Sequence, residues 1–416
     1  MNFPQHFLLG AATAAHQVEG NNTNSDLWAQ EQCPHSTNAE PSLDACDHYH
    51  RFAQDIALMA DAGLNAYRFS VEWARIEPEE GRFDEAEIAH YGAVLDCCRT
   101  HGLEPIVTLH HFSSPKWLIT KGGWEAESTV EYFARYCRYV VEKLGDKMNY
   151  VCTINEANMG LQMAAMVARM MKQGGGSLQI GVDPTKGMAE LMMEQAQAFG
   201  VSDPQEIHVF LSPKSLKGDQ VIMRAHAAAR EAIRAVNPKL KVGLTLSLHD
   251  IQPLPGGEDN ARRIWEDEFT HYLPYLREDD FVGVQNYTRE LVDESGICTV
   301  PEGCPLTQMN YEDYPAALGH VIRRVAAELS LPILVTENGI ATTDDQRRID
   351  FVREALDGVK GCIADGIDVR GYLYWSFIDN YEFAKAFTVQ FGLVAMDRAT
   401  KERKPKPSLS WLGAQR

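Results

Sequence analysis

Residues 333–339 read ILVTENG, and the first three of them are aliphatic. A strand with one face in solvent would alternate apolar with polar side chains, so an unbroken apolar run indicates a strand covered on both faces. Strands of this kind occur in parallel sheets with helices packed on both sides. Because the run leads into Glu337, the sequence predicts a carboxylate at the carboxyl end of a buried parallel strand.

YVCTIN at residues 150–155 has the same design, and Glu156 follows it directly. Two buried strands therefore each end on a glutamate. Two carboxyl groups that flank one acetal can cleave it, because one attacks or stabilises the positive carbon while the other protonates the leaving oxygen. This pair of residues suggests a site of that chemistry at the ends of two strands.

Short apolar runs alternate along the chain with longer segments of helical periodicity, which is the pattern of repeated βα units around a parallel sheet. We expect eight strands, at residues 7–12, 65–71, 104–110, 150–155, 242–248, 281–287, 332–337 and 369–376. Barrels with loop insertions commonly reach the 416 residues of this chain. The predicted fold class is α/β, a (β/α)8 TIM barrel, with residues 1–416 forming a single domain.

The interval between the fourth and fifth predicted strands is far longer than an ordinary connection. We predict an enlarged insertion of loops and helices there, at about residues 159–217. It carries methionines at helical spacing, at Met159, Met163, Met166 and Met170. They could form an adaptable hydrophobic wall for a variable leaving group, but a stripe at this spacing more often packs a helix against the core, and we favour core packing.

Polar residues stand at the same point of nearly every predicted βα unit, at the end of the strand. They are His16, Gln17 and Glu19, Arg68, His110 and His111, Asn155 and Glu156, His249 and Asp250, Asn286 and Tyr287, Glu337, and Trp375 and Ser376. A paired surface charge or a hydrogen-bonded core histidine would explain each one alone. Since barrel enzymes build their sites from the carboxyl ends of several strands, the repetition predicts that these side chains converge.

The composition restricts the partners and the compartment of the protein. With 39 basic and 58 acidic residues the net charge is -19, which disfavours binding to nucleic acid or to an anionic membrane surface. The nine cysteines are odd in number and follow no CxxC or framework spacing, so we expect reduced thiols in a cytoplasm.

FLLGAATAA at residues 7–15 ends in small residues, as the cleavage site of a signal peptide does. However, no basic segment precedes it and its apolar run is short. We interpret it as the first barrel strand. No run in the sequence approaches the ~20 apolar residues that a membrane-spanning helix requires.

A metal site is a further interpretation, suggested by His48, His50, His110 and His111. Their spacing matches no set of zinc ligands. Adjacent histidines on a strand also point to opposite faces, so we predict that one of the pair His110 and His111 packs in the core and the other faces the pocket.

The motifs TINEA at residues 153–157 and VTENG at 335–339 resemble glycoside hydrolase family 1, the β-glucosidase family of retaining (β/α)8 barrels. The resemblance covers nearly the whole chain, in order, except for about residues 159–217. It extends to FLLGAATAAHQVEG at 7–20, YRFSVEWARIEP at 67–78, TLHHFSSPKWL and GGW within 108–124, DFVGVQNYTR at 280–289, GYLYWSFIDNYEF at 371–383 and FGLVAMD at 391–397.

This resemblance implies a retaining, exo-acting β-glycosidase of the β-glucosidase type that needs no cofactor or metal. Its substrates would be oligosaccharides or aryl and alkyl glycosides with a β-linked non-reducing-end sugar. It implies that Glu337 is the nucleophile and Glu156 the acid/base, with Arg68 and Tyr287 beside the nucleophile. The residues that it implies for binding the sugar are Gln17, His111, Asn155, Trp375, Glu382 and Phe383.

The sequence departs from the family pattern at four positions near the implied site. Alanine replaces proline at Ala157, phenylalanine replaces tryptophan at Phe112 and Phe383, and glutamine replaces asparagine at Gln285. None of these changes removes a catalytic group. Losing two indole N–H donors does, however, leave the preferred sugar open, so a β-galactoside or β-fucoside preference stands as an alternative.

Two other functions compete with this reading. A 6-phospho-β-glucosidase of the same family would need a cation for the phosphate; Lys385 is close in sequence, but Glu382 would repel the anion. A noncatalytic sugar-binding barrel would have lost one of the two glutamates, and both are present. The sequence does not decide whether the protein forms a homo-oligomer.

Overall fold

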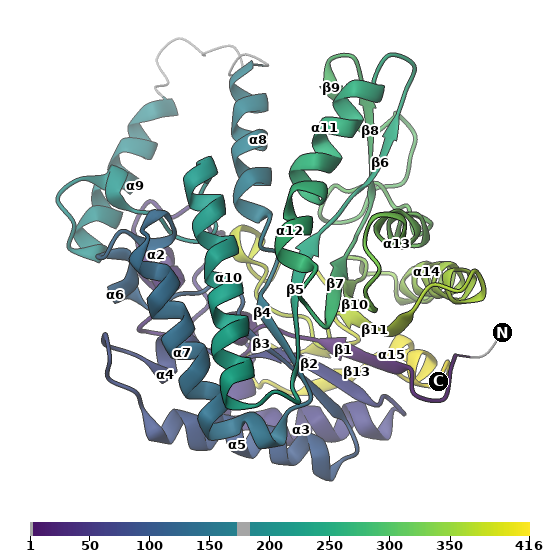
Figure 1. Ribbon diagram of the computed structural model, residues 1–416, viewed down its shortest axis with the longest axis horizontal. Coiled ribbons are helices and arrows are strands. Elements are labelled where there is room, and N and C mark those ends of the chain that lie inside the picture. The colour runs from purple at the N-terminus through teal and green to yellow at the C-terminus, as the bar shows by residue number, and fades with distance from the viewer. Residues whose placement is uncertain (1–2, 173–183) are drawn as a thin grey trace.

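The computed structural model describes residues 3–172 and 184–416, although the side chains of residues 170–172 and 184–188 lie outside the description. Parallel strands form a closed barrel at the centre of the molecule, and helices surround it (Figure 1). The barrel strands are β1 (Leu8–Ala12), β2 (Ala66–Ser70), β3 (Glu104–His110), β4 (Tyr150–Ile154), β5 (Lys241–Ser247), β7 (Phe281–Gln285), β10 (Ile333–Asn338) and β11 (Val369–Trp375).

The barrel closes where the first strand meets the last. Strand β1 pairs in parallel with β2 on one side and with β11 on the other, in a register that runs from Leu8 opposite Gly371 to Ala12 opposite Trp375. Going round from β1, the order of the strands is β11, β10, β7, β5, β4, β3 and β2. The predicted (β/α)8 barrel is confirmed, and every predicted strand is present with its ends within two residues of the expected ones.

Side chains of the barrel strands alternate between two apolar clusters, even where every residue of a strand is buried. In β2, Ala66 belongs to a cluster inside the barrel, whereas Tyr67 and Phe69 belong to the larger core between the strands and the helices. This alternation follows from the two-residue repeat of a strand. Arg68 therefore projects into the barrel, where it can contact residues from other strands.

The helices cover the outside of the barrel with one apolar face each. In α7, the buried residues Phe133, Tyr136, Cys137, Val140 and Leu144 recur at three- and four-residue intervals, which puts them on one face. The longer helices are α3 (His48–Asp61), α5 (Glu85–Thr100), α7 (Ser128–Leu144), α8 (Met159–Lys172), α9 (Pro184–Phe199), α10 (Leu216–Val236), α11 (Glu258–Glu268), α13 (Ala317–Glu328) and α14 (Asp345–Ala364).

Side-chain caps fix the starts of several of these helices. Asp84 accepts hydrogen bonds from Ala86 N and Glu87 N at the start of α5, and Ser215 accepts one from Gly218 N at the start of α10. Shorter helical segments fill the connections, namely α1 (Ala15–Val18), α2 (Asp26–Glu31), α4 (Trp73–Ile76), α6 (Lys116–Ile119), α12 (Leu273–Leu276), α15 (Pro407–Gly413), η1 (Gly123–Glu125), η2 (Gly145–Lys147), η3 (Pro204–Glu206), η4 (Thr270–Tyr272) and η5 (Phe383–Lys385).

The predicted insertion after β4 contains α8, α9 and η3, and both long helices lie at the top of Figure 1. Met159 packs against the main core, which agrees with the core packing that we favoured from the helical spacing of the methionines. Met163 and Met166 are half-buried. The side chain of Met170 lies outside the described residues. None of the helices that the structure describes is both long enough and apolar enough to span a lipid bilayer.

Small strands outside the barrel were not expected from the sequence. They form a three-stranded sheet of β6 (Asp250–Pro253), β8 (Arg289–Asp293) and β9 (Gly296–Ile297), and a hairpin of β12 (Val394–Met396) and β13 (Arg403–Pro405). The first sheet stands above the ends of β5 and β7 at the upper right of Figure 1. These strands are short and lie within loops, so they lack the long apolar runs that marked the barrel strands.

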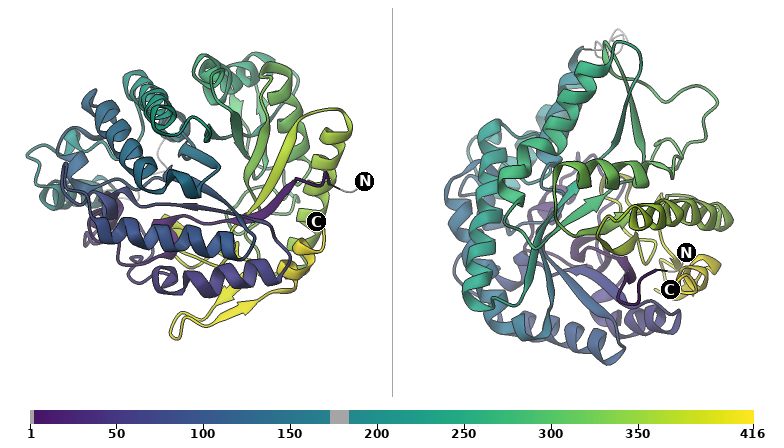
Figure 2. Two further views of the ribbon diagram at one scale, coloured as in Figure 1. Left: turned by 60° about the horizontal axis from the view of Figure 1, so that its bottom comes forward. Right: turned by 45° about the vertical axis from the view of Figure 1, so that its right-hand side comes forward.

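The end of the chain folds back onto its beginning. Figure 2 shows the two termini on the same side of the molecule in both views. In β13, the guanidinium group of Arg403 donates to both carboxylate oxygens of Asp55 in α3, at 2.7 and 2.8 Å, and both side chains are buried. Asp55 also accepts from His48 Nδ1 at 2.7 Å if that nitrogen carries the proton.

Candidate active site

All eight barrel strands are parallel, so their carboxyl ends meet at one rim (Figure 1). Glu337 lies on β10, and an irregular pairing of this strand with its neighbours turns the Glu337 side chain toward the inside of the barrel. Leu334 is in the inner cluster and Val335 in the outer core, so strict alternation would turn Glu337 outward. The register of β10 shifts between Val335 and Glu337 against both neighbouring strands. A bulge of this kind re-aims the side chains that follow it.

Two buried groups hold the carboxylate of Glu337. Arg68 Nη1 donates to Oε1 at 2.5 Å, and the hydroxyl group of Tyr287 donates to Oε2 at 2.6 Å. Burial raises the pKa of Glu337 above its usual value, and the charge of Arg68 and the hydrogen bonds from Tyr287 and Arg68 oppose that rise. Each oxygen of Glu337 therefore has a donor that favours its anionic form.

Arg68 also connects this carboxylate to the end of β4. Its Nη2 donates to Asn155 Oδ1 at 2.5 Å, and Gln285 Nε2 donates to the same oxygen at 2.7 Å. Two donors fix the amide of Asn155, so its Nδ2 group is turned away from them. Gln285 was expected only as a departure from a family pattern, and the structure shows it within this network.

Glu156 follows Asn155 with a φ of 43°. This left-handed backbone conformation costs a residue with a side chain about 1 to 2 kcal/mol, and strain of this kind persists where surrounding contacts impose it. The N–H group of Glu156 donates to Thr245 Oγ1 of β5 at 3.1 Å, and Ala157 N donates to Thr245 O at 3.1 Å. These bonds hold the turn that directs Glu156 toward the rim.

The two glutamates have different electrostatic surroundings. Burial raises the pKa of Glu156 to about 8, and the negative charge of Glu337 adds to that effect. No described cation forms an ion pair with Glu156, whereas Glu337 has Arg68 in contact. The site therefore contains one carboxyl group that favours holding a proton and one whose contacts favour a negative charge.

Gln17, Trp375 and Glu382 lie together at the junction of the first and last strands. Trp375 Nε1 donates to Glu382 Oε1 at 3.1 Å. Gln17 Nε2 donates to Asn380 Oδ1 at 3.1 Å and to Tyr381 O at 2.8 Å. Burial raises the pKa of Glu382 to about 8, which the hydrogen bond from Trp375 opposes.

His111 faces the same group from the end of β3. Its ring stacks beside that of Trp375, with centroids 5.7 Å apart and planes at 16°. Burial lowers the pKa of His111 well below its usual value, so the ring is neutral. Phe383 is half-buried and contacts Phe112 edge-on, with ring centroids 5.6 Å apart. All the residues predicted for the sugar are thus at the same rim as the two glutamates.

Several polar atoms of these residues are buried but have no hydrogen-bond partner among the described residues. They are Gln17 Oε1, His111 Nδ1, Asn155 Nδ2 and Gln285 Oε1. Buried polar groups in folded proteins almost always have partners, so such a cluster marks a place for polar groups of a ligand. Donors and acceptors of this kind, next to an indole ring, fit the hydroxyl groups and the apolar face of a sugar.

Other residues predicted from strand ends have structural roles instead. His110 packs among Trp124, Phe133 and Phe210, and its Nε2 lies 3.0 Å from Ser114 Oγ. His110 thus packs in the core, as predicted for one of the two adjacent histidines, whereas His111 lies beside Trp375. Within the described residues, no group of three or more His, Cys, Asp or Glu side chains is arranged to hold a metal ion.

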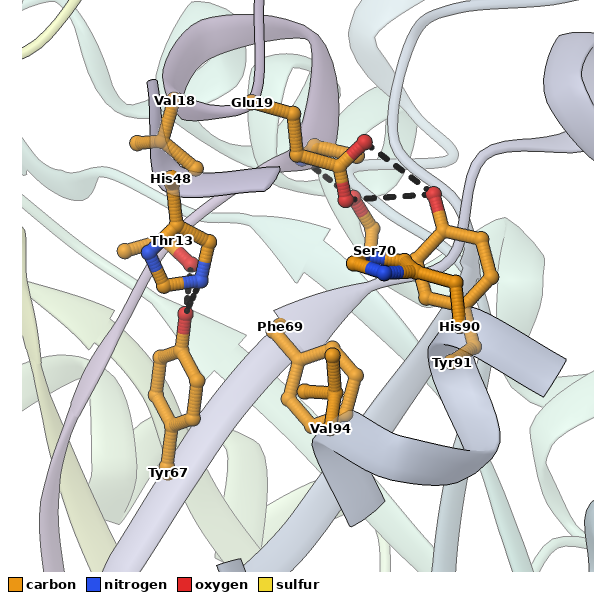
Figure 3. Close-up of a pocket in the computed structure, with 11 residues that line it drawn as sticks. Thr13, Val18, Glu19, His48, Tyr67, Phe69, Ser70, His90, Tyr91 and Val94 are labelled. Carbon is orange, nitrogen blue, oxygen red and sulfur yellow. Dashed lines mark hydrogen bonds between the residues drawn. The ribbon is translucent and has the colours of Figure 1, made fainter. Parts of the chain in front are cut away.

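Figure 3 shows a small cavity whose lining includes Thr13, Tyr67 and Tyr91. Neither Glu156 nor Glu337 lines it. Its volume is about 10 Å³, which is enough for one water molecule and far too little for a sugar. Glu19 lines it and accepts from the hydroxyl group of Tyr91 at 3.1 Å and from Arg75 Nε at 2.9 Å. Glu19 and His48 therefore belong to the packing around the barrel.

Two parts of the rim were missed at the sequence level. Tyr311, in the loop before α13, is 38% exposed, and burial together with Glu156 and Glu382 raises the pKa of its hydroxyl group to about 12. His249 was noted only as a polar strand end, and its partner Glu268 was not noted at all. Tyr311 lies in a loop, and Glu268 lies at the end of α11, 19 residues after His249. Neither stands at the end of a barrel strand, which is where the sequence argument placed the site residues.

A closed (β/α)8 barrel that carries paired buried carboxyl groups and sugar-binding side chains at its carboxyl rim defines a glycoside hydrolase. The model of the family described as glycosyl hydrolase family 1 matches residues 1–297 and 277–414, and the chain belongs to this family.

Known proteins resemble the chain over nearly its full length. A crystal structure of beta-glycosidase BGL167 is 48% identical, with a TM-score of 0.90, and the match covers 99% of this chain and 96% of that one. Beta-glucosidase A of Thermotoga maritima is 27% identical over 98% of this chain and 96% of its own length. The aryl-phospho-beta-D-glucosidase BglC of Bacillus subtilis is 28% identical over 99% of this chain and 97% of its own length.

Proposed function

We propose that the protein is a retaining, exo-acting β-glycosidase of the β-glucosidase type, with Glu337 as the nucleophile and Glu156 as the acid/base. The observation that carries this proposal is the asymmetry between the two buried carboxyl groups. Arg68 and Tyr287 both donate to Glu337, whereas burial and the charge of Glu337 keep a proton on Glu156. A nucleophile must be anionic and an acid must be protonated, so these surroundings support Glu337 as the nucleophile and Glu156 as the acid/base.

In the first step, Glu337 attacks the anomeric carbon of the sugar and the bond from that carbon to the leaving oxygen breaks. Glu156 gives its proton to that oxygen, so the leaving group departs as an alcohol. The resulting ester removes the negative charge of Glu337, and the pKa of Glu156 falls because that charge had raised it. In the second step, Glu156 takes a proton from water, whose oxygen attacks the same carbon and releases Glu337.

Retention requires that the two carboxyl groups lie ~5 to 5.5 Å apart. Glu156 and Glu337 are near enough for the charge of one to raise the pKa of the other. We expect NMR of the reaction with an aryl β-glucoside to show the β-anomer of the free sugar first, with the α-anomer growing in by mutarotation. An α-anomer formed first would indicate inversion and would contradict the assignment of Glu337.

Glucose is the sugar that we propose for the site, on the similarity to Beta-glucosidase A of Thermotoga maritima and on the sugar-binding residues Gln17, His111, Asn155, Trp375 and Glu382. Phenylalanine at Phe112 and Phe383 removes two indole N–H donors from the rim, so β-galactosides and β-fucosides remain alternative substrates. The rates of nitrophenol release from the nitrophenyl β-glucoside, β-galactoside and β-fucoside will rank the three sugars as substrates.

A 6-phospho-β-glucoside is the alternative that the similarity to BglC raises. Glu382 stands among the sugar-binding residues, and its carboxyl group offers a phosphate dianion no positive charge. Lys385 is exposed, and its backbone N–H group bonds to Glu382 O at 3.0 Å. We therefore favour an unphosphorylated sugar. A noncatalytic sugar-binding barrel is disfavoured because both glutamates and the donors to Glu337 are present.

Replacing Glu382 by alanine should lower kcat/KM for the β-glucoside by roughly 10²-fold or more, because its bonds to the sugar hydroxyls tighten in the transition state. A substrate that lacks the distal hydroxyl groups should lose much less. Steady-state kinetics on both substrates make the comparison. If both lose activity equally, Glu382 shapes the loop around Tyr381 and does not bind the sugar.

We also infer that residues 1–416 work as one domain in a cytoplasm. The pairing of β1 with β11 and the ion pair of Arg403 with Asp55 join the two ends of the chain, which supports a single folding unit. All nine cysteines are free thiols, and burial raises the pKa of Cys46, Cys98 and Cys137. Thiols of this kind suit a reducing compartment.

A further inference from the structure

Gln285 ends β7 and is completely buried beside the nucleophile. In the pairing of β7 with β10 it lies opposite Glu337, and its Nε2 donates to Asn155 Oδ1 at 2.7 Å. Arg68 Nη2 donates to the same oxygen of Asn155, and Arg68 Nη1 donates to Glu337. Gln285 is thus bonded to Asn155 directly and, through Arg68, connected to the carboxylate that attacks the sugar.

The contacts of the two side-chain amides fix the orientation of each. Arg68 has only donors, so the atom of Asn155 that it contacts is the oxygen. With that oxygen in place, the atom of Gln285 that contacts it is the nitrogen. Gln285 Nε2 also lies 3.3 Å from Thr245 Oγ1, so both of its hydrogen atoms have an acceptor. Turning either amide over would set two donors or two acceptors against each other.

The other atom of each amide, Gln285 Oε1 and Asn155 Nδ2, is buried and has no hydrogen-bond partner among the described residues. These two atoms are of opposite kind, since the oxygen accepts and the nitrogen donates. They lie in the same part of the site, because the two amides are in contact through their other atoms. An acceptor and a donor in one place suit a hydroxyl group, which donates its hydrogen atom and accepts on its oxygen.

The position of this pair along the sugar follows from its neighbours. Asn155 directly precedes Glu156 in the chain, and Arg68 bonds both to Asn155 and to Glu337. In the proposed mechanism Glu337 attacks the anomeric carbon, C1. A hydroxyl group held by Gln285 and Asn155 is therefore the one on the adjacent carbon, C2. Hydrogen bonds to the 2-hydroxyl group strengthen in the transition state of glycoside cleavage.

We propose that Gln285 binds the substrate and selects β-glycosides with a free 2-hydroxyl group: its Oε1 accepts the hydrogen atom of that group while Asn155 Nδ2 donates to its oxygen. This inference rests on the proposed function, because the attack by Glu337 places the sugar. Fluorine at C2 can only accept, so it leaves Gln285 Oε1 unpaired. Gln285 replaces the asparagine of the family pattern, and its additional methylene group lets one side chain contact both Asn155 and the sugar.

Two substrates that differ only at C2 test this contact. They are 2,4-dinitrophenyl β-glucoside and its 2-deoxy-2-fluoro analogue, and release of dinitrophenolate gives the second-order rate constant of the first step for each. Fluorine withdraws electrons and slows this step in every variant, so the quantity to compare is the ratio of the two rate constants, hydroxyl over fluorine. In Gln285→Met this ratio should fall by about 10-fold or more, because only the hydroxyl substrate loses a hydrogen bond.

A second background separates contact with the sugar from positioning of Asn155. Asn155→Asp keeps an oxygen that accepts from Arg68 and Gln285 and replaces only the free donor atom. Gln285→Met should again lower the ratio by about 10-fold when it is added to Asn155→Asp.

Gln252→Met is the matched control, since Gln252 lies in the small sheet outside the barrel and both of its amide atoms have partners. Its Nε2 donates to Asp250 Oδ2 at 2.6 Å, and its Oε1 accepts from Arg289 Nη1 at 2.9 Å. This variant should leave the ratio unchanged. Thermal unfolding followed by circular dichroism shows whether each variant is folded.

The outcomes distinguish this inference from the proposed function. Equal losses on both substrates in Gln285→Met would show that Gln285 only supports the end of β7, and the inference would be wrong. It would also be wrong if the ratio fell only when Asn155 is intact, because Gln285 would then act by orienting Asn155. Mass spectrometry after reaction with the fluoro substrate should find the sugar on Glu337. A sugar on another residue would contradict the proposed function itself.

Discussion

Replacing Glu337 by glycine should reduce kcat/KM by on the order of 10⁵-fold or more for every substrate, whatever its leaving group. Without a carboxylate at this position no glycosyl ester can form, and Arg68 and Tyr287 lose the group to which they donate. Loss that is independent of the leaving group is therefore the expected signature of the nucleophile. Steady-state rates with 4-nitrophenyl and 2,4-dinitrophenyl β-glucosides measure it.

Azide provides the control for this variant. The glycine leaves space on the face that Glu337 occupied, so azide should attack the anomeric carbon from that face while Glu156 still protonates the leaving oxygen. The product should be the α-glycosyl azide, which NMR distinguishes from the β-anomer. A β-azide, or full activity without azide, would show that another residue attacks the sugar.

Replacing Glu156 by alanine should give a loss that depends strongly on the leaving group. Alcohols and weakly acidic phenols need a proton to depart, and their first step should slow by roughly 10²- to 10⁴-fold. Dinitrophenolate departs without one, so the variant should still form the glycosyl ester from that substrate and then stall, because no base activates water. A burst of dinitrophenolate followed by slow turnover is the expected time course.

Azide should rescue the second step of this variant, because it needs no base and fits into the space left by the side chain. It attacks the glycosyl ester of Glu337 from the opposite face, so the product should be the β-glycosyl azide. The two variants should therefore yield glycosyl azides of opposite anomeric configuration. Equal anomers from both, or no rescue of either, would overturn the assignment of Glu156 and Glu337.

The barrel itself could be predicted because each strand carries its own signal. Apolar runs such as those at residues 104–110 and 333–337 are local, and the two-sided burial that they imply is specific to parallel sheets covered by helices. The convergence of Arg68, Asn155, Glu156 and Glu337 followed from the same argument, since parallel strands share a rim. Their proximity is a property of the topology and needs no pattern beyond strand ends.

The details that orient the site could not be predicted, because they depend on contacts between distant segments. The bulge in β10 turns Glu337 inward, against the direction that simple alternation gives. The left-handed backbone at Glu156 is imposed by bonds to Thr245, which lies in another strand. Neither feature has a local sequence signature such as glycine. The sequence therefore identified Glu156 and Glu337 but did not predict the backbone conformations that orient them.

The closure of the barrel has a consequence for how the protein is made. Gln17 bonds to Asn380 and Tyr381 across sequence separations of 363 and 364 residues, and Trp375 stands opposite Ala12. Contacts of such long separation form late in folding, because the loop that they close is entropically costly. On a ribosome, a chain that already contains both glutamates still lacks the last strand and with it Trp375 and Glu382. The sugar pocket is therefore completed only when synthesis is nearly finished. A chain released early would contain Glu156 and Glu337 but would lack Trp375 and Glu382, which we propose bind the sugar.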